Sequence, residues 1–425
     1  METMRAYKFR IYPDAKRQKA IDDSISISQR LYNKLLEKTI NAHKNNPDSK
    51  ISQGTINQFL NEIIKENKEY LQLYAHIRVD IRNRLLKTYQ NFFRRCKQKK
   101  SGAKIKVGFP RFKSKDKYNS ITHIENNDSF RIEKGRLRIS KIGTMRIEQH
   151  RNITGNVKTM TIKREGKEYY AIFTAERIIN PPKIKDTNPV GIDLGLNSFV
   201  AMSDGIKKEK PKFAMKKEKK LAHWQRVIAK KDMIAKKQKR SKYTKNRAKA
   251  ITHLQEAWSE VTNQSNDFAH KLSDELVNSG YTSFAVENLN IQNMVKNHNL
   301  AQSIQNASWN RFVQMLSYKA ESAGMKVNLV DPTNTTQECS ICHNIKKGEE
   351  KLTLKDRIYQ CYVCGLRMDR DINAAINILK RAREGYSRSN ASGDATSTIQ
   401  QGLQVASVNQ EHTLQRTVAG EAHTL

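Results

Sequence analysis

Residues 339–379 read CSICHNIKKGEEKLTLKDRIYQCYVCGLRMDRDINAAINIL, and this stretch decides how the chain is organised. It holds two Cys-x-x-Cys pairs with 18 residues between Cys342 and Cys361, and then Asp369 and Asp371 at the start of an apolar helical pattern. This spacing is typical of a zinc ribbon, in which two tight turns place four thiolates around one tetrahedral ion. Since such a site has no open position, the expected zinc ion is structural, and its ligands are Cys339, Cys342, Cys361 and Cys364.

Composition indicates a nucleic-acid partner. The 425 residues predict two or three domains, and 78 Lys and Arg against 42 Asp and Glu give a net charge of +36. So large an excess is costly unless a polyanion neutralises it, and a membrane surface is the weaker alternative. The sequence lacks an apolar run of spanning length and a signal-peptide pattern, so we expect a cytoplasmic, nucleoid-associated protein and no membrane partner. Four of the five cysteines lie in the ribbon, which favours metal over disulfides.

The first hundred residues predict a strand and long helices. Residues 5–12 alternate apolar and basic side chains before Pro13, and a helix is expected after Asp14. A second helix over about 76–95 carries Arg78 and Arg82 on its polar face, which is either a solvated surface or a phosphate-tracking one. Residues 94–117 contain eleven Lys and Arg, interleaved with two phenylalanines. These phenylalanines suit either stacking on bases or simple anchoring of a loop, and the candidate nucleic-acid contacts of the segment are Arg111 and Lys113.

The middle of the chain changes character twice. Segments within 118–178 are short, alternating and punctuated by Gly or Asn, which indicates an antiparallel sheet or small barrel, and the proline-rich residues 179–189 form a linker. Residues 207–250 contain nineteen Lys and Arg and three acids. Such a block is not expected to pack against itself and predicts a disordered arm or a helix along a phosphate backbone. Its candidate nucleic-acid contacts are Lys230, Lys231, Lys236, Lys237 and Arg240.

Acidic residues interrupt two apolar β-patterns beyond the linker. Asp193 lies in VGIDLG, and Glu287 ends the strand pattern of YTSFAVENLN. A buried aspartate is costly unless something pairs with it, although a turn or cap role is the plain alternative. Together with Asp369 or Asp371, these acids lie on a strand, a strand end and a helix start. Acids from separate elements suit two Mg²⁺ ions that catalyse phosphodiester hydrolysis.

The motifs resemble the TnpB (OrfB) proteins of insertion sequences, which are related to compact type V CRISPR effectors. The likeness rests on GIDLG, VENLNI and CxxC…CxxCGxxxDRDxNAAxNIL, with YKFRIYP, RLYN and GFPRFKSK in the same order before them. It implies an α+β multidomain protein: an oligonucleotide-binding β-barrel with a helical lobe, and a RuvC-like, RNase H-type α/β nuclease domain with an inserted zinc ribbon. The implied bounds are 1–18 and 97–185 for the barrel, 19–96 for the lobe, 190–336 and 366–385 for the nuclease domain, and 337–365 for the ribbon.

The resemblance also implies which residues act. Asp193, Glu287 and Asp371 would be the catalytic acids and Mg²⁺ (or Mn²⁺) ligands, while Asp369, two residues from Asp371, is expected to cap or orient the helix. His343 stands where this family usually has Gly, so it is a competing zinc ligand, with four cysteines favoured.

The implied activity is RNA-guided cleavage of double-stranded DNA beside a short motif, by an endonuclease of the kind called a transposase. Its partners would be guide RNA, target DNA and a transposase of the same element. The alternatives are a regulator or transposition accessory with little cleavage, a guide-independent structure-selective nuclease, and a strict transposase. Residues 386–425 are polar and low in charge, and we expect them to be disordered.

Overall fold

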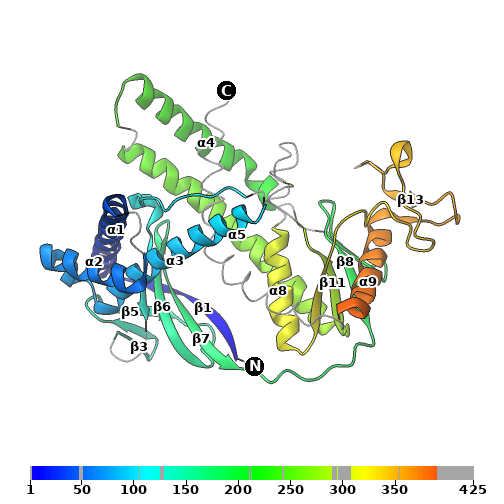
Figure 1. The fold of residues 1–425 in the computed structure, drawn as a ribbon, viewed down its shortest axis with the longest axis horizontal. Helices are drawn as coiled ribbons and strands as arrows, with labels where there is room; N and C mark the ends of the chain where they lie inside the picture. Colours follow the sequence, from blue (N-terminus) through cyan, green and yellow to red (C-terminus); the bar gives the residue numbers. More distant parts are fainter. Residues whose placement is uncertain are drawn as a thin grey trace. The chain divides into compact units, whose positions relative to one another are not determined.

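The protein is described by a computed structural model, shown in Figure 1, in which the chain forms two compact units, Met1–Asn180 and Pro181–Leu425. The structure describes residues 2–46, 51–103, 105–124, 129–209, 211, 213–241, 244–289, 294, 308–353 and 355–389. The tail expected to be disordered lies outside these residues except for its first four, which continue the last helix. None of the described helices is long and apolar enough to cross a membrane.

Three helices of the first unit pack on one another. The helix expected after Asp14 is confirmed as α1 (Ala15–Asn45), and the Asp14 carboxylate accepts a hydrogen bond from the Arg17 backbone N–H as its N-cap. The helix expected over 76–95 is α3 (Ala75–Lys100). Between them lies α2 (Gln53–Glu66), which the sequence analysis missed, although Ser52 caps it and an apolar face is buried through Ile56, Leu60 and Ile63.

A seven-stranded antiparallel sheet completes the first unit. Its strands are β1 (Glu2–Tyr12), β2 (Ser120–Ile124), β3 (Phe130–Glu133), β4 (Arg136–Ile139), β5 (Gly143–Glu148), β6 (Asn156–Glu165) and β7 (Glu168–Ile178), in the spatial order β2-β6-β7-β1-β5-β4-β3. β1 pairs with both β5 and β7, which confirms that the N-terminal strand joins the sheet predicted over 118–178. The sheet is curled, with β2 and β3 as its edges among the described strands.

His123 is a buried base in this unit. It lies on β2, stacked on Tyr74 at 5.8 Å between ring centroids and edge-on to Phe130, and neither ring nitrogen has a hydrogen-bond partner among the described residues. Burial, assisted by the nearby His76, lowers the pKa of His123 from 6.5 to about 4. The imidazole is therefore neutral at neutral pH and packs as an apolar group.

Acidification is expected to destabilise the protein through His123. Between pH 6.5 and about 4 the unfolded chain binds a proton that the folded chain does not, so stability is lost as the pH falls. Full loss amounts to about 3 kcal/mol. His123→Leu should remove this component from the pH dependence of urea unfolding, whereas His43→Leu, at the exposed end of α1, should leave it as in the wild type. Equal acid sensitivity in both variants would contradict this role.

The second unit is built on a five-stranded mixed sheet. Its strands are β8 (Pro189–Asp193), β9 (Ser198–Met202), β10 (Lys207–Glu209), β11 (Ser283–Glu287) and β12 (Lys326–Val330), in the order β10-β9-β8-β11-β12. β11 runs parallel to β8 and β12, while β9 is antiparallel to β8. Figure 1 shows α9 (Arg370–Ser389) lying next to β8 and β11.

Helices cover both faces of this sheet. α5 (Lys245–Asn278) and α8 (Trp309–Ser322) cover one face, where their apolar side chains share a core with Val190, Ile192, Phe284 and Val286. The intervening Ala285 packs on the opposite side with Ile378 and Ala382 of α9. This division follows from the strands, since successive side chains point to opposite faces.

Gly191 allows α9 to approach β8 closely. A Cβ atom at this position would lie 2.0 Å from the Ala375 carbonyl oxygen and 2.9 Å from the Cβ of Leu379. The backbone of the strand therefore contacts the backbone of the helix, which only a residue without a side chain permits. The glycine of the GID motif thus lets residues 375–379 of α9 pack directly on β8, two residues before Asp193.

The helix that was one of the two expectations for the basic block 207–250 is confirmed by α4 (Phe213–Lys237), but its packing on a neighbouring helix was not expected. Residues 207–209 form the edge strand β10, and α4 pairs with the first half of α5. Leu221 and Ile228 of α4 bury against Ala250, Leu254, Ala257 and Val261 of α5. The block can pack because its lysines lie on the outer surface of the hairpin, where water screens them, while a narrow apolar stripe forms its seam.

Candidate metal centres and nucleic-acid surface

Asp193 and Glu287 point to the same face of the sheet. β8 and β11 are parallel neighbours with Ile192 opposite Val286, so the acids that follow these residues end adjacent strands at the same level. Asp193 lies two residues after Gly191, and Glu287 two residues after Ala285. Because Gly191 and Ala285 face α9, both acids face α9 as well. Asp371 lies in the first turn of that helix.

The buried Asp193 carboxyl is subject to the charges of the other two acids. Burial, with the charges of Glu287 and Asp371, raises the pKa of Asp193 well above its ordinary value, and Lys207 and Arg370 offset only part of this. Burial also raises the pKa of Glu287. The exposed fractions of the three residues are only 7, 8 and 9 %, so water screens their mutual repulsion poorly. Such repulsion is relieved by a proton or a cation.

Asp369 and Asp371 have different partners, as the sequence analysis expected. The Asp369 carboxylate accepts hydrogen bonds from the backbone N–H groups of Asp371 and Ile372 at 2.9 and 3.2 Å, which confirms it as the cap of α9. The Lys207 ammonium lies 2.6 Å from Asp369 and 3.7 Å from Asp371. Together with the N–H donors, Lys207 lowers the pKa of Asp369, although partial burial raises it. The Arg370 guanidinium donates to Asp371, so this carboxylate is held between two cations.

The three carboxylates differ in kind from the cysteine cluster. The four cysteine sulfurs all lie within 4.8 Å of one another and suit a soft ion. The acids instead offer hard oxygen ligands from two strand ends and a helix start. Buried, mutually repelling carboxylates of this kind suit hard divalent cations.

The four cysteines come together as their spacing predicts, in a group of the size that holds one metal ion. The Cys339 and Cys364 sulfurs lie 3.5 Å apart and those of Cys342 and Cys361 3.6 Å apart. Four ligands at a zinc–sulfur distance of about 2.3 Å in a tetrahedron require sulfurs separated by roughly 3.8 Å, so the cluster fits zinc. His343, the competing ligand, lies outside it, at a left-handed turn position with its Nδ1 2.9 Å from Glu338.

The candidate nucleic-acid residues have different environments. Arg78 donates to the carbonyls of Tyr70 and Leu73, and Arg82 to Asn57 and Asn83, so both guanidinium groups already have partners within the protein. Burial lowers the pKa of Lys113, while Arg111 is exposed. On the α4 hairpin the candidates are exposed apart from the half-buried Lys231, and no ion pair reaches them among the described residues; they are Lys230, Lys231, Lys236, Lys237 and Arg240.

Sequence reasoning missed three residues that contact the acids. Lys207 and Arg370 flank Asp371, and the buried Thr335 hydroxyl donates to the Glu287 carboxylate. Arg370 lies within the DRD motif and could have been found from it. Lys207 carried no signal, because it is one of many lysines in a basic run. Thr335 lies in TNTTQECS, which stands where the resembling family usually has a Thr-Ser-Gln arrangement, but nothing in that segment indicated a contact with Glu287.

Comparison with known proteins adds three family matches. Residues 1–47 match an OrfB (IS605) family model described as a helix-turn-helix domain; in this chain they form β1 and α1. Residues 168–298 match the OrfB (IS605) model described as a probable transposase. Residues 309–378, which include α8, β12 and the ribbon, match a Cas12f1-like model described as a TNB domain.

Relatives and a solved structure agree with these matches. A protein of Streptomyces pristinaespiralis named "Putative RNA-guided DNA endonuclease" is 28% identical over 386 residues, covering 89% of this chain and 89% of the relative. "Putative RNA-guided DNA endonuclease InsQ" of Escherichia coli K12 is 27% identical over 318 residues, covering 69% and 71%. The protein in a cryo-EM structure of a Cas12f1–sgRNA–target DNA complex has a similar fold, with a TM-score of 0.55 at 14% identity, covering 89% of this chain and 98% of that one.

Proposed function

We propose that this chain, which matches OrfB (IS605) family models over residues 1–47 and 168–298, is an RNA-guided DNA endonuclease encoded by a transposable element. The proposal is supported chiefly by Asp193 and Glu287, which end adjacent strands on the sheet face covered by α9, the helix whose first turn carries Asp371. The net charge of +36 supports a nucleic-acid partner. Burying three mutually repelling carboxylates is costly, and binding nucleic acid alone does not require it. The site favours cleavage over a purely regulatory role.

The three carboxylates would hold two Mg²⁺ ions, and the four cysteines one structural Zn²⁺. Bound Mg²⁺ would stabilise the attacking and leaving oxygens of phosphodiester hydrolysis. Water supplies the new phosphorus–oxygen bond, the bond to the 3′ oxygen breaks, and the products are a 5′-phosphate and a 3′-hydroxyl. Lys207 and Arg370 hold Asp371 in place and offset part of the negative charge of the site. The closed thiolate cluster takes no part in bond cleavage.

The guide RNA and the protein would each recognise a different part of the double-stranded target DNA. Base pairing with the guide reads most of the target, while the protein reads a short adjacent motif, as in other RNA-guided nucleases. We assign residues 1–18 and 97–185 to an oligonucleotide-binding barrel, 19–96 to a helical lobe, 190–336 and 366–385 to a RuvC-like nuclease domain and 337–365 to its zinc ribbon. The exposed lysines of α4 support a nucleic-acid surface on the second unit.

Exposed lysines of α4 are expected to bind phosphates. Replacing Lys230, Lys236 and Lys237 with Gln should weaken nucleic-acid binding for all sequences alike. The slope of log K against log salt should also become less steep, by about 0.7–0.9 for each phosphate that the protein no longer neutralises. The control replaces Lys217 and Lys220, whose ammonium groups already pair with Glu260 on α5. The slope is measured by filter binding. An unchanged slope in the first variant would show that these lysines of α4 do not contact phosphates.

The proposed function is tested by isolating the tagged protein from its host and sequencing the RNA that copurifies. We expect a discrete transcript that ends beside the gene of the protein, and programmed cleavage in vitro when its guide segment is changed to match a new target. RNA at ribosomal background together with cleavage of branched DNA would instead identify a guide-independent nuclease. A specific transcript without cleavage would identify a regulator.

A further inference from the structure

A short connector joins β12 to the zinc ribbon, and we define it as residues 331–338. It turns at Asn334, whose φ is +61°, and Thr333 donates from its backbone N–H and its hydroxyl to Asp331. The connector continues directly into Cys339, the first cysteine of the cluster. It therefore lies between the sheet that carries Glu287 and the ribbon.

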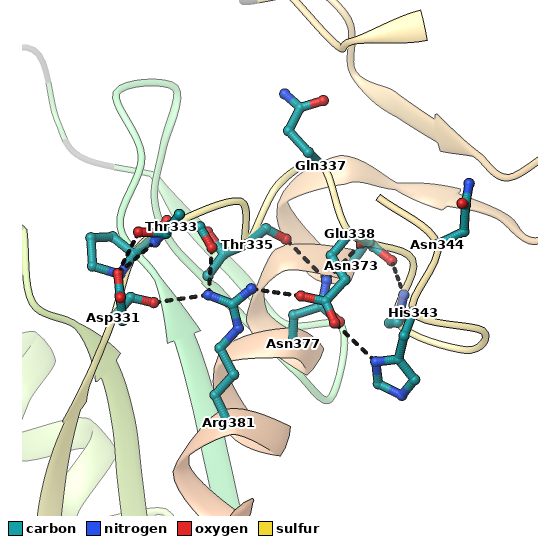
Figure 2. A network of polar contacts seen from close by, with 12 residues as sticks. Asp331, Thr333, Thr335, Gln337, Glu338, His343, Asn344, Asn373, Asn377 and Arg381 are labelled. Carbon is teal, nitrogen blue, oxygen red and sulfur yellow. Dashed lines mark hydrogen bonds and ion pairs between the residues drawn. The ribbon is translucent and has the colours of Figure 1, made fainter. Parts of the chain in front are cut away.

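One face of α9 clamps the connector along its whole length. Asn373, Asn377 and Arg381 follow one another at steps of four, so they share a face of the helix. Figure 2 shows Arg381 between the two ends of the connector. Its guanidinium donates to the carbonyls of Asp331 and Thr333 at 3.0 and 2.6 Å and to the Glu338 carboxylate at 2.6 Å.

The two asparagines hold the remaining backbone. The Asn377 amide donates to the carbonyls of Thr335 and Glu338 at 3.0 and 2.7 Å, and the Asn373 amide also donates to the Glu338 carbonyl at 2.7 Å. Both asparagines are almost fully buried. Buried amides that bond backbone carbonyls fix a loop more firmly than exposed ones, because breaking such bonds leaves polar groups without partners away from water.

Thr335 is the connector residue that reaches the acids. Its side chain is buried, with an exposed fraction of 2 %, and its hydroxyl donates to Oε1 of Glu287. The Pro332 carbonyl oxygen, 3.3 Å away, is the weaker acceptor for the same proton. Since a hydroxyl has a single proton, the carboxylate receives it, because charged acceptors form the stronger hydrogen bonds. Donation to Oε1 leaves Oε2 of Glu287 available to a cation.

We propose that Thr335 is a positioning residue for Glu287, held in place by the clamp of Asn373, Asn377 and Arg381. The proposal rests on the proposed function only in that Glu287 binds a divalent cation. It gives α9 a second role: the helix carries Asp371 itself and, through the connector, also sets the orientation of Glu287. Two of the three acids are then aligned by one element.

The test compares Thr335→Val, which keeps the shape of the side chain and removes the hydroxyl, with Thr335→Ser, which keeps the hydroxyl. Mn²⁺ binding to the purified, zinc-loaded, RNA-free protein is measured from the electron paramagnetic resonance signal of free Mn²⁺. The valine variant is expected to bind Mn²⁺ between about 10-fold and 100-fold more weakly than the wild type, while the serine variant stays within about 3-fold. The Mg²⁺ concentration for half-maximal cleavage should shift in parallel.

Each result of this comparison decides the proposal. Wild-type Mn²⁺ affinity in Thr335→Val would overturn it, and equal losses in Val and Ser would assign the effect to packing. Zinc content and melting temperature are measured on all variants to detect unfolding. If Thr335→Val unfolds the connector, the comparison of Thr335→Ser with the wild type still tests the role of the hydroxyl. If the protein bound Mn²⁺ as expected but cleaved no guided target, the proposed function would fail while the positioning role stood.

A double variant tests the clamp. Asn377→Leu removes both amide bonds to the connector and should weaken Mn²⁺ binding in the same direction as Thr335→Val. Because the two residues act through one hydrogen bond to Glu287, the combined loss should be well below the product of the separate losses. A fully multiplicative loss would show that Asn377 acts independently of Thr335.

Discussion

Asp193→Asn is expected to abolish target cleavage and to make the metal-free protein more stable. Loss of a carboxylate that holds a cation against the developing charge removes several kcal/mol of transition-state stabilisation, which corresponds to a rate loss of about a thousand-fold or more. Guide RNA binding should remain as in the wild type, because Asp193 is buried at the end of β8 and the proposed RNA contacts are exposed lysines of α4. Cleavage and RNA binding are measured on the same preparation.

The gain in stability follows from the raised pKa of Asp193. As the pH rises above the ordinary aspartate pKa, the unfolded chain releases its proton first, so the folded state loses stability until the pH passes the raised pKa of the buried group. The asparagine variant lacks this loss. In Mg²⁺-free buffer at neutral pH its melting temperature should exceed that of the wild type, by about 2–4 °C for each kcal/mol relieved, and the difference should shrink in acid.

The matched control is Asp267→Asn, which neutralises an exposed aspartate that pairs with Lys271 on α5. It should change neither cleavage nor the pH dependence of melting. Added Mg²⁺ should raise the melting temperature of the wild type and of this control but not of Asp193→Asn, since only a chain that binds the ion is stabilised by it. Retained cleavage in Asp193→Asn would contradict the proposal that the three acids form the catalytic centre.

Cys361→Ser is expected to remove zinc and, with it, cleavage at every Mg²⁺ concentration. Cys361 is buried in the small core of the ribbon with Cys339 and Tyr359, and a serine there supplies neither the thiolate nor the sulfur packing. Zinc binding contributes about 10–16 kcal/mol to small zinc modules, so the ribbon should unfold without it. Ser340, between two of the ligands, bonds Asn373 and Lys380, so unfolding also frees one face of α9.

Cys96→Ser supplies the control, because Cys96 lies on α3 in the other unit and outside the cluster. Metal analysis should give one zinc per chain for the wild type and for Cys96→Ser, and almost none for Cys361→Ser. Excess Mg²⁺ should restore no activity to Cys361→Ser, since the two metals have different sites. Full cleavage by a zinc-free protein would show that the ribbon has no structural role in the centre.

Local patterns were enough to predict the parts of the site that depend on spacing. The two Cys-x-x-Cys pairs, with 18 residues between Cys342 and Cys361, were enough to predict that the four cysteines come together. The apolar runs before Asp193 and Glu287 indicated strands, and these are β8 and β11. The cap formed by Asp369 was likewise predictable, because capping depends on residues two and three positions along the helix.

Features that depend on distant contacts could not be predicted. Which face of the sheet the acids share follows from the packing of α9 on Gly191, a contact between residues nearly two hundred positions apart. The bond from Thr335 to Glu287 depends on a connector whose own sequence is polar and irregular. The α4 hairpin was misjudged because net charge outweighed the apolar stripe of Leu221 and Ile228 in the prediction.

The order of the three acids along the chain has a consequence for biosynthesis. Asp193 and Glu287 belong to adjacent strands, but α9, which supplies Asp371 and clamps the connector, is the last helix that the structure describes. Domains fold as the ribosome releases them, N-terminal parts first. A nascent chain therefore displays its basic hairpin and its first two acids before the third exists. Translation products that stop before residue 371 lack Asp371 and leave the α9 face of the sheet uncovered, so we expect them to cut no target.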